Sequence, residues 1–357
     1  MKKNNKIIIF CVIFCIVLAI LLFFVFQKNK KIVNQTGSGS ISKTTLSGGL
    51  AVDSQKDNSK NGLVVTVIED KRNPDAKLGH YINNLKAQVK AVAEAQIKNL
   101  DFSDASVKEY LQKNNITTLP AIVFSTIDFD TSNDANVDGM DIKKFLTQMS
   151  SGEYFLDIGA DYNPFTASDR GLPILDKSIL EAIKKDSFFE NGNDKKVIWL
   201  EYSDLSCAYC KAFHNSGVIT EVLKKYGNEV SKAYNHYIVH DGKHFEILEC
   251  MAEQKGEKGF FSLIENSFKN SAHEEASLIA EAVKLGADKS KLEKCVLDGT
   301  YRKKVEDQTN RGLKSFNITS TPSSVFINAE TGEYRVLRGY SEDNSSLPFM
   351  DSIEIVK

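Results

Sequence analysis

The sequence predicts two α/β domains that follow an N-terminal membrane-spanning helix. Three observations predict this organisation: an unbroken apolar run over residues 7–26, short apolar strands that alternate with helical segments, and a length of 357 residues, which exceeds that of a typical single domain. The net charge of −2 argues against nucleic acid as a partner, because phosphate binding needs a basic face. The predicted parts are a cytoplasmic tail at 1–6, a membrane anchor at 7–26, a linker at 27–61, a first domain at 62–160, a connector at 161–179 and a second domain at 180–357.

The apolar run at residues 7–26 has the length of a helix that crosses a bilayer. A cleaved signal peptide stays the alternative, although it would have a shorter apolar core and a small-residue cleavage site, and this run ends in Phe-Val-Phe followed by Gln and Lys. Cys11 and Cys15 lie on one face of the predicted helix. We expect them to be apolar helix residues, with disulfide-linked dimerisation as the sharper alternative. Residues 27–61 are rich in Ser, Gly, Thr, Asn and Lys, which is typical of a flexible linker.

The first domain contains short apolar stretches and segments of helical periodicity. We predict strands at 63–68, 121–124 and 154–158 and helices at 78–100 and 107–113.

A segment of the first domain, Asp134 to Gly139, resembles the first half of a calcium-binding EF-hand loop. Asp141 and Phe145 stand where that loop needs an apolar residue and a bidentate glutamate. We therefore predict a polar turn here and no calcium site.

The second domain carries a pair of cysteines in the spacing C-x-x-C. Cys207 and Cys210 follow a strand predicted at 197–202 and open a helix predicted at 208–226. The first thiol thus lies at a helix N-terminus, where backbone N–H groups and the helix dipole favour a thiolate. The second thiol lies one turn further, within reach to close a disulfide, so the arrangement favours thiol–disulfide exchange. Half of a zinc site is the alternative, disfavoured because the soluble part has no second C-x-x-C or C-x-x-H; an inert or static thiol pair is another.

The remainder of this domain is predicted to be mostly helical from Phe245 to Gly299. A hairpin is then expected, with strands at 323–328 and 334–337.

This ordered set of elements resembles the DsbA branch of the thioredoxin superfamily, a family of thiol:disulfide oxidoreductases. The resemblance covers residues 180–357 and has a second anchor in the Thr-Pro of the segment 318–328. It implies a thioredoxin-like fold with a helical insertion. It also implies that Pro322 is cis, that Thr321 and Pro322 face the cysteines, and that this loop pairs with an extended substrate peptide. An ordinary trans-proline turn is the alternative.

The resemblance assigns further roles in the second domain. Cys207 would be the nucleophile and Cys210 the resolving thiol, with Tyr209 between them as a tuning and substrate-contacting position. The preceding Ala208 departs from the proline common in the family, which leaves oxidant versus isomerase open. An acid such as Glu201 often lies beneath the second cysteine, where burial would raise its pKa and let it take a proton; a strand-end carboxylate in solvent is the alternative.

Other family features concern His214 and the two remaining cysteines. Protonated His214 would favour a thiolate, although packing or solvent is the simpler role for a residue one turn after the pair. Several DsbA-like proteins carry a structural disulfide between similar helices, which implies a bond between Cys250 and Cys295. Two buried free thiols remain the alternative.

The first domain resembles a thioredoxin-like domain as well, because Leu119-Pro120 precedes its second strand as a cis-proline loop would. By that resemblance the C-x-x-C would fall at Asn73 to Ala76, which holds no cysteine. We therefore expect a degenerate copy that serves docking or spacing.

The function expected from this resemblance is disulfide formation in exported proteins. The soluble domains would lie outside the cytosol of a bacterial cell, where disulfides persist, and residues 7–26 would hold the chain in the bilayer. A quinone-linked membrane partner would reoxidise the pair, without an organic cofactor or metal. The alternatives are a disulfide isomerase or reductase, and a non-catalytic peptide-binding chaperone or scaffold.

Overall fold

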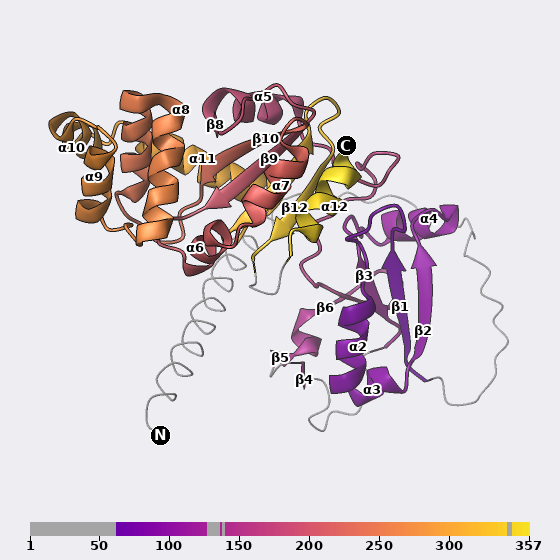
Figure 1. Ribbon diagram of the computed structural model, residues 1–357. Coiled ribbons are helices and arrows are strands. Elements are labelled where there is room, and N and C mark those ends of the chain that lie inside the picture. Colours follow the sequence, from indigo (N-terminus) through magenta and orange to yellow (C-terminus); the bar gives the residue numbers. More distant parts are fainter. Residues whose placement is uncertain (1–61, 127–135, 138–139, 341–344) are drawn as a thin grey trace, which may run out of the picture. The chain divides into compact units, whose positions relative to one another are not determined.

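The computed structural model describes residues 62–126, 136–137, 140–340 and 345–357. The predicted cytoplasmic tail, membrane anchor and linker, with Cys11 and Cys15, lie outside these residues, as does most of the calcium-loop-like segment. Within the described ranges, none of the helices is both long and apolar enough to cross a membrane. Two five-stranded sheets organise the described chain, and each belongs to a domain of its own (Figure 1).

The first domain is built on a sheet with the strand order β2-β1-β3-β7-β6. Strand β2 is parallel to β1, whereas β3 is antiparallel to β1 and β7 is antiparallel to β3. The elements are β1 (Val64–Glu69), α2 (Gly79–Gln88), α3 (Lys90–Ala93), β2 (Gln96–Asp101), α4 (Ala105–Lys113), β3 (Ala121–Phe124), β4 (Asn136–Val137), β5 (Met140–Asp141), the 3₁₀ helix Ile142–Phe145, β6 (Leu146–Gln148) and β7 (Tyr154–Leu156).

The long helix predicted at 78–100 is wrong. Helix α2 ends before Val89, whose backbone is extended, and the chain re-forms one short helix before it becomes strand β2. Leu85, Val89 and Val92 are buried at the helical spacing that suggested one element. Ile97 instead pairs with Val65 of the neighbouring strand, so tertiary pairing overrides the local periodicity. The strands predicted at 63–68 and 121–124 and the helix at 107–113 are confirmed within one or two residues.

The second domain has a sheet with the order β12-β11-β9-β10-β8. Its first four strands repeat the pattern of the first domain: β10 is parallel to the central β9, β11 is antiparallel to β9, and β12 is antiparallel to β11. The elements are α5 (Lys177–Asp186), β8 (Phe188–Phe189), β9 (Val197–Ser203), α6 (Ala208–Asn215), α7 (Val218–Tyr226), β10 (Val230–His236), α8 (His244–Asn270), α9 (Glu275–Lys284), α10 (Lys289–Leu297), α11 (Arg302–Phe316), β11 (Ser323–Asn328), β12 (Tyr334–Arg338) and α12 (Leu347–Val356).

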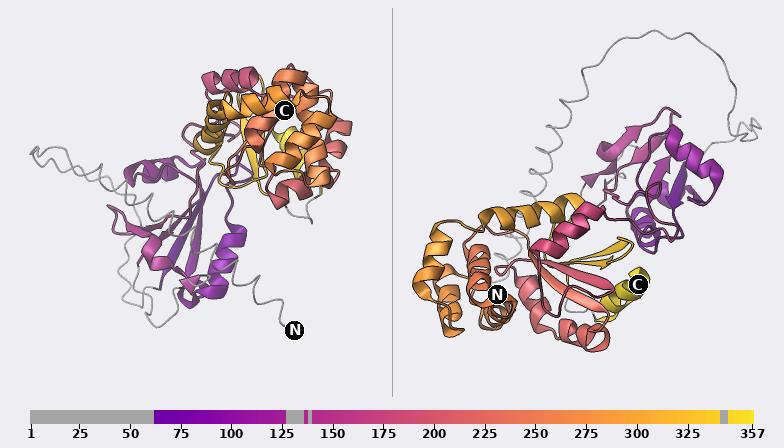
Figure 2. Two further views of the ribbon diagram at one scale, coloured as in Figure 1. Left: turned by 90° about the vertical axis from the view of Figure 1, so that its left-hand side faces the viewer. Right: turned by 90° about the horizontal axis from the view of Figure 1, so that it is seen from above.

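Strand β9 is buried along its whole length because helices cover both faces of its sheet (Figure 2). Successive side chains of a strand point to opposite faces, and β9 feeds two apolar clusters in this way. Val197 and Trp199 pack with residues of α7 and α12, whereas Ile198, Leu200 and Tyr202 pack with residues of α5 and the end of α11. The strand is thereby held rigidly, and the position of the chain that leaves it is fixed.

The single helix predicted at 208–226 is also wrong, because the segment forms α6 and α7. The break lies at Gly217, whose φ of 83° is in the left-handed region that glycine adopts without steric cost. Phe213, Val218 and Val222 still pack into one cluster on the sheet. The hairpin predicted at 323–328 and 334–337 is confirmed.

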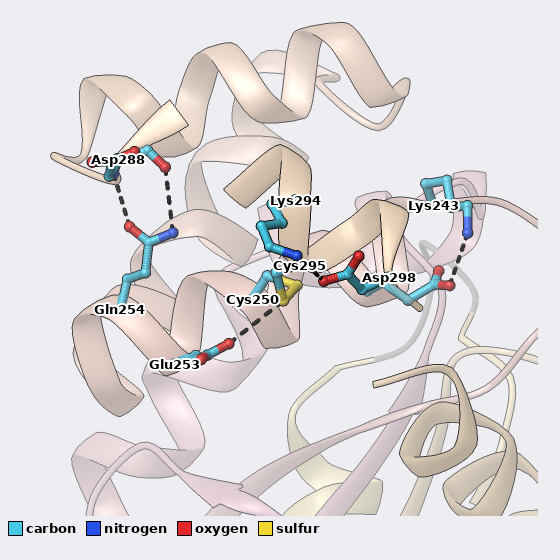
Figure 3. Close-up of a disulfide and its surroundings, with 9 residues drawn as sticks. Lys243, Cys250, Glu253, Gln254, Asp288, Lys294, Cys295 and Asp298 are labelled. Atoms are coloured by element: carbon cyan, nitrogen blue, oxygen red, sulfur yellow. Dashed lines mark hydrogen bonds and ion pairs between the residues drawn. A yellow bond between two sulfur atoms is a disulfide. The ribbon is translucent and has the colours of Figure 1, made fainter. Parts of the chain in front are cut away.

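Three helices, α8, α9 and α10, form a bundle inserted between β10 and α11, as predicted for residues 245–299 (Figure 1). Cys250 on α8 and Cys295 on α10 form a disulfide, with their Cα atoms 6.0 Å apart (Figure 3). The pairing implied by the family resemblance is therefore confirmed. The bond closes a loop with a sequence separation of 45, for which the chain-entropy relation gives at most about 4 kcal/mol of stabilisation.

Replacing both cysteines of this disulfide tests that contribution. We expect Cys250→Ala/Cys295→Ala to lower the free energy of unfolding by about 2–4 kcal/mol, because the unfolded chain regains the entropy of an open loop. Urea denaturation of the variant and of the parent chain measures the difference. Equal stability of the two would mean that the helices hold the bundle without the bond.

Candidate active site

A buried aspartate fixes the turn between β9 and the cysteine pair. Asp204 directly follows β9 and is fully buried. Its carboxylate accepts hydrogen bonds from the backbone N–H of Ser206 at 2.8 Å and from Nε2 of His244 at 2.9 Å. Its backbone carbonyl accepts from the N–H of Cys207 at 3.0 Å. Burial raises the pKa of this carboxyl, but the hydrogen bonds outweigh burial and the pKa lies below its ordinary value.

Cys207 is the N-cap of helix α6. Its Sγ accepts a hydrogen bond from the backbone N–H of Cys210 at 3.4 Å, which satisfies one of the donors left free at the start of a helix. The same sulfur lies 3.4 Å from the backbone oxygen of Thr321, and the bond between Thr321 and Pro322 is cis. The structure thus brings together four of the predicted site residues from two segments that lie 114 positions apart.

The two thiols have opposite electrostatic environments. The hydrogen bond from the Cys210 side chain is the largest cause that lowers the pKa of Cys207, to about 6. The Thr321 side chain and the N–H groups of Cys210 and Tyr209 add to it against burial. Burial, together with the neighbouring Cys207, raises the pKa of Cys210 well above its ordinary value. Cys207 therefore carries the thiolate of the pair near neutral pH. It is 8% exposed and Cys210 is fully buried, so an attacking group reaches the pair at Cys207.

Glu201 belongs to a buried ion cluster beneath helix α6. It is fully buried on β9, and its two carboxylate oxygens lie 2.7 Å from Nε2 of His214 and 2.6 Å from Nζ of Lys232. Burial raises the pKa of Glu201, but the charges of His214 and Lys232 outweigh burial and the pKa is lowered. The predicted burial is confirmed, whereas the raised pKa is wrong. An ionised carboxylate held by Lys232 and His214 is a poor acceptor for the proton of Cys210, so Glu201 is better described as a member of a supporting polar cluster.

The two other predicted site residues lie differently. His214 stacks on Phe268, with ring centroids 4.3 Å apart, while it contacts Glu201, so it joins packing and the ion cluster at once. Tyr209 is 65% exposed in the first turn of α6, beside the thiols and available to a partner.

Sequence reasoning missed Asp204 and Lys232. An aspartate two residues before a serine at the end of a strand is a signal for an Asx turn, and this signal could have found Asp204. Lys232 lies on β10, a strand that was not predicted from the sequence. Its side chain is 2% exposed and lies over the ring of Trp199. No local pattern marks a buried lysine, because its partner Glu201 is 31 positions away.

The comparisons with known proteins concern the second domain. Residues 192–335 match the family model described as thioredoxin. Solved structures similar to this chain include alpha-DsbA1 of Wolbachia pipientis (17% identity, 48% of this chain and 90% of that chain covered, TM-score 0.41), DsbA2 of Pseudomonas aeruginosa (25%, 46% and 92%, TM-score 0.37) and BdbD of Bacillus subtilis in its oxidised form (17%, 48% and 92%, TM-score 0.39). The comparison with curated proteins found no match.

The matched model and the paired thiols together define the class. Among the described cysteines, Cys207 and Cys210 are the two that are free, and both lie within the residues 192–335 that match the thioredoxin model. At this general level the chain is an oxidoreductase with a thioredoxin-like domain.

The pH dependence of alkylation tests the low pKa of Cys207. We expect its reaction with iodoacetamide to follow a titration with a midpoint near pH 6, because only the thiolate reacts, and to slow about tenfold for each pH unit below that. Mass spectrometry of the tryptic peptide 197–211 measures the rate.

Cys210→Ala is the matched variant for this measurement. It removes the largest hydrogen bond to the Cys207 sulfur, so the midpoint should move upward. A midpoint near pH 8.5 in the parent chain, as for an unperturbed cysteine, would contradict the assignment.

We expect the buried cluster of Glu201, His214 and Lys232 to contribute to the stability of the fold. Lys232→Met leaves Glu201 with His214 as its partner, and breaking a buried pair costs about 3–5 kcal/mol. Urea denaturation at pH 7 measures the loss. The double variant Glu201→Gln/Lys232→Met should recover part of it, because no uncompensated carboxylate remains. Since the pKa of Glu201 is lowered on folding, the stabilisation of the parent chain is present above the ordinary value of 4.5 and declines as the pH falls below it. A loss under about 1 kcal/mol in the single variant would show that the cluster is not stabilising.

Proposed function

We propose that this chain forms disulfides in exported proteins through Cys207 and Cys210. The observation that carries the proposal is the placement of the Cys207 sulfur, which caps helix α6, accepts from the N–H of Cys210 and faces the Thr321 backbone. These surroundings lower the pKa of Cys207. A stabilised thiolate is a good leaving group in thiol–disulfide exchange. It favours the reduced form of the enzyme pair and so makes the oxidised pair a stronger oxidant.

The exchange begins with the Cys207–Cys210 disulfide. A substrate thiolate attacks Sγ of Cys207, the bond between the two enzyme sulfurs breaks, and Cys210 leaves with the electron pair and takes up a proton. A second substrate thiolate then attacks the substrate sulfur of the mixed disulfide, and Cys207 leaves as the stabilised thiolate. The substrate loses two electrons and gains a disulfide, and the enzyme pair is reduced.

The backbone before Pro322 supports a substrate-binding role for this loop. The backbone oxygen of Thr321 contacts the Cys207 sulfur at 3.4 Å. A peptide that pairs with this backbone would therefore place its own cysteine beside the thiol. The exposed ring of Tyr209 would lie against the same peptide.

The proposed setting of the reaction is the bacterial cell envelope. Residues 7–26 would anchor the chain in the lipid bilayer, with both domains outside the cytosol. The disulfide between Cys250 and Cys295 supports this setting, because disulfides are rare in the cytosol. A quinone-linked membrane partner would accept the two electrons from the reduced pair.

A disulfide isomerase or reductase is the second candidate. Thioredoxin also has a cysteine whose pKa lies below the ordinary value, as the pKa of Cys207 does, so the pair would also suit substrates that already carry a disulfide.

The first domain is, in this proposal, a degenerate thioredoxin-like copy without redox activity. Its support is the strand pattern shared by the two sheets and the cis bond of Leu119-Pro120 before β3. Docking or spacing would be its contribution.

The reduction potential of the pair separates the two candidates. The full chain is equilibrated in glutathione buffers, trapped by alkylation, and the peptide 197–211 is read by mass spectrometry. We expect a value above about −180 mV for a protein that introduces disulfides, and a value near −270 mV would indicate a reductase.

Serine variants test whether the cysteines carry the activity at all. Cys207→Ser should abolish oxidation of a reduced substrate protein. Cys210→Ser, given a substrate that already carries a disulfide, should accumulate a mixed disulfide at Cys207: the Cys207 thiolate attacks that disulfide, one substrate sulfur leaves as a thiolate, and the resolving thiol is absent. Full activity in Cys207→Ser would favour the chaperone or scaffold instead.

A further inference from the structure

The turn after β1 in the first domain repeats the turn after β9 in the second. Asp70 directly follows β1 and is fully buried, like Asp204. Its side chain accepts from the backbone N–H two residues later, Arg72, at 3.0 Å. Its carbonyl accepts from the N–H three residues later, Asn73, also at 3.0 Å. Ser206 and Cys207 make the same two bonds to Asp204.

The strand register extends this equivalence to the proline loops. Ile68 of β1 pairs with Ala121, the residue after Pro120. Tyr202 of β9 pairs with Ser323, the residue after Pro322. Each buried aspartate lies two positions beyond the paired residue of its strand. In this register Leu119 corresponds to Thr321 and Asn73 to Cys207.

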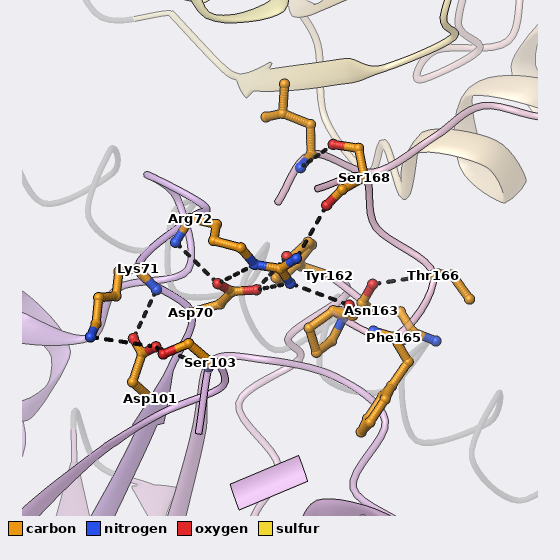
Figure 4. A network of polar contacts seen from close by, with 12 residues as sticks. Asp70, Lys71, Arg72, Asp101, Ser103, Tyr162, Asn163, Phe165, Thr166 and Ser168 are labelled. Atoms are coloured by element: carbon orange, nitrogen blue, oxygen red, sulfur yellow. Dashed lines mark hydrogen bonds and ion pairs between the residues drawn. The ribbon is translucent and has the colours of Figure 1, made fainter. Parts of the chain in front are cut away.

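In the first domain this equivalent edge is occupied by the chain itself. The N–H of Leu119 donates to the carbonyl of Tyr162 at 2.8 Å, and the two residues form an isolated antiparallel bridge. The Tyr162 hydroxyl donates to the Asp70 carboxylate at 2.7 Å (Figure 4), and Asn73 also lies beside it. Tyr162 is 8% exposed. Tyr162 thus lies across the position where the second domain has its nucleophile, and the chain turns after it at residues 164–166.

Further contacts hold the segment that follows Tyr162. The Arg72 guanidinium, paired with Asp70, donates to the carbonyls of Pro164 and Ser168 at 3.4 and 3.2 Å (Figure 4). Phe165 packs edge-on against Phe102, with centroids 5.0 Å apart. The segment is therefore held by one backbone bridge and by side chains, without joining the sheet as a strand. Among the residues that the structure describes, no segment forms such a bridge to Thr321.

We propose that the first domain retains a peptide-binding edge and that residues 160–166 fill it as an internal ligand. The site recognises an extended peptide with a tyrosine, because the buried Asp70 accepts its hydroxyl and Leu119 pairs with its backbone. Displacement of the internal segment opens the edge to a tyrosine-containing segment of a partner protein. The proposal does not depend on thiol chemistry, since Asn73 stands in the position of the nucleophile.

Hydrogen exchange at the Leu119 amide tests the proposal in the full chain held in detergent. In the parent chain this amide should exchange slowly, and in Tyr162→Ala at least about tenfold faster, because its acceptor segment is released. Tyr110→Ala is the matched control: it removes a half-buried tyrosine that packs on the same apolar cluster and bonds to Glu153, and it should leave the Leu119 amide slow. A synthetic peptide of residues 158–166 added to Tyr162→Ala should restore slow exchange, and the same peptide with its tyrosine replaced by alanine should not.

Two results would overturn the proposal. One is fast exchange of the Leu119 amide in the parent chain; the other is failure of the peptide to slow exchange in a folded Tyr162→Ala. If denaturation of Tyr162→Ala shows no cooperative transition, this variant is not folded and Tyr162→Phe replaces it. Tyr162→Phe keeps the ring and removes only the hydroxyl that bonds to Asp70. The reduction potential of Cys207 and Cys210 should be the same in each of these variants, so the outcome is separate from that of the proposed redox function.

Discussion

The turn held by Asp204 is the constraint on which the redox site depends. The Asp204 carboxylate accepts a hydrogen bond from the backbone N–H of Ser206 because the chain turns directly after β9. This turn places Cys207 at the start of α6. The side chain of Cys210 then makes the largest hydrogen bond that lowers the pKa of Cys207, and the helix terminus adds N–H donors to the same sulfur. The Thr321 carbonyl lies beside the sulfur, where it accepts from the protonated thiol. The low pKa of Cys207 therefore comes from hydrogen bonds donated to one atom, which water can replace only in part.

A buried polar cluster lies beneath helix α6. Glu201, His214 and Lys232 join β9, α6 and β10 by contacts that require all three elements to be in place. Buried ion clusters are costly to assemble and more costly to break. Such a cluster tolerates little displacement of α6 relative to the sheet, so it maintains the geometry of the thiols without touching them.

The sequence was sufficient for those features whose signal is local. The C-x-x-C pair after an apolar strand, the Thr-Pro before another and the helical insert were all predicted in their places. Prediction failed where distant partners decide. Residues 96–101 have helical neighbours but become a strand because β1 offers them an edge, and the helix after the cysteines breaks because Gly217 adopts a left-handed conformation. The pKa of Glu201 was predicted in the wrong direction because packing between separate elements brings His214 and Lys232 to its carboxylate.

The disulfide between α8 and α10 makes the maturation of this protein depend on an oxidant. A chain proposed to supply disulfides to others carries one of its own, between two helices of its bundle. Newly made molecules receive that bond from existing ones or from another oxidant. The fraction of molecules with this disulfide formed would then depend on the oxidising capacity of the compartment, which the protein itself would help to maintain. Ample oxidant would raise that fraction, and depleted oxidant would lower it.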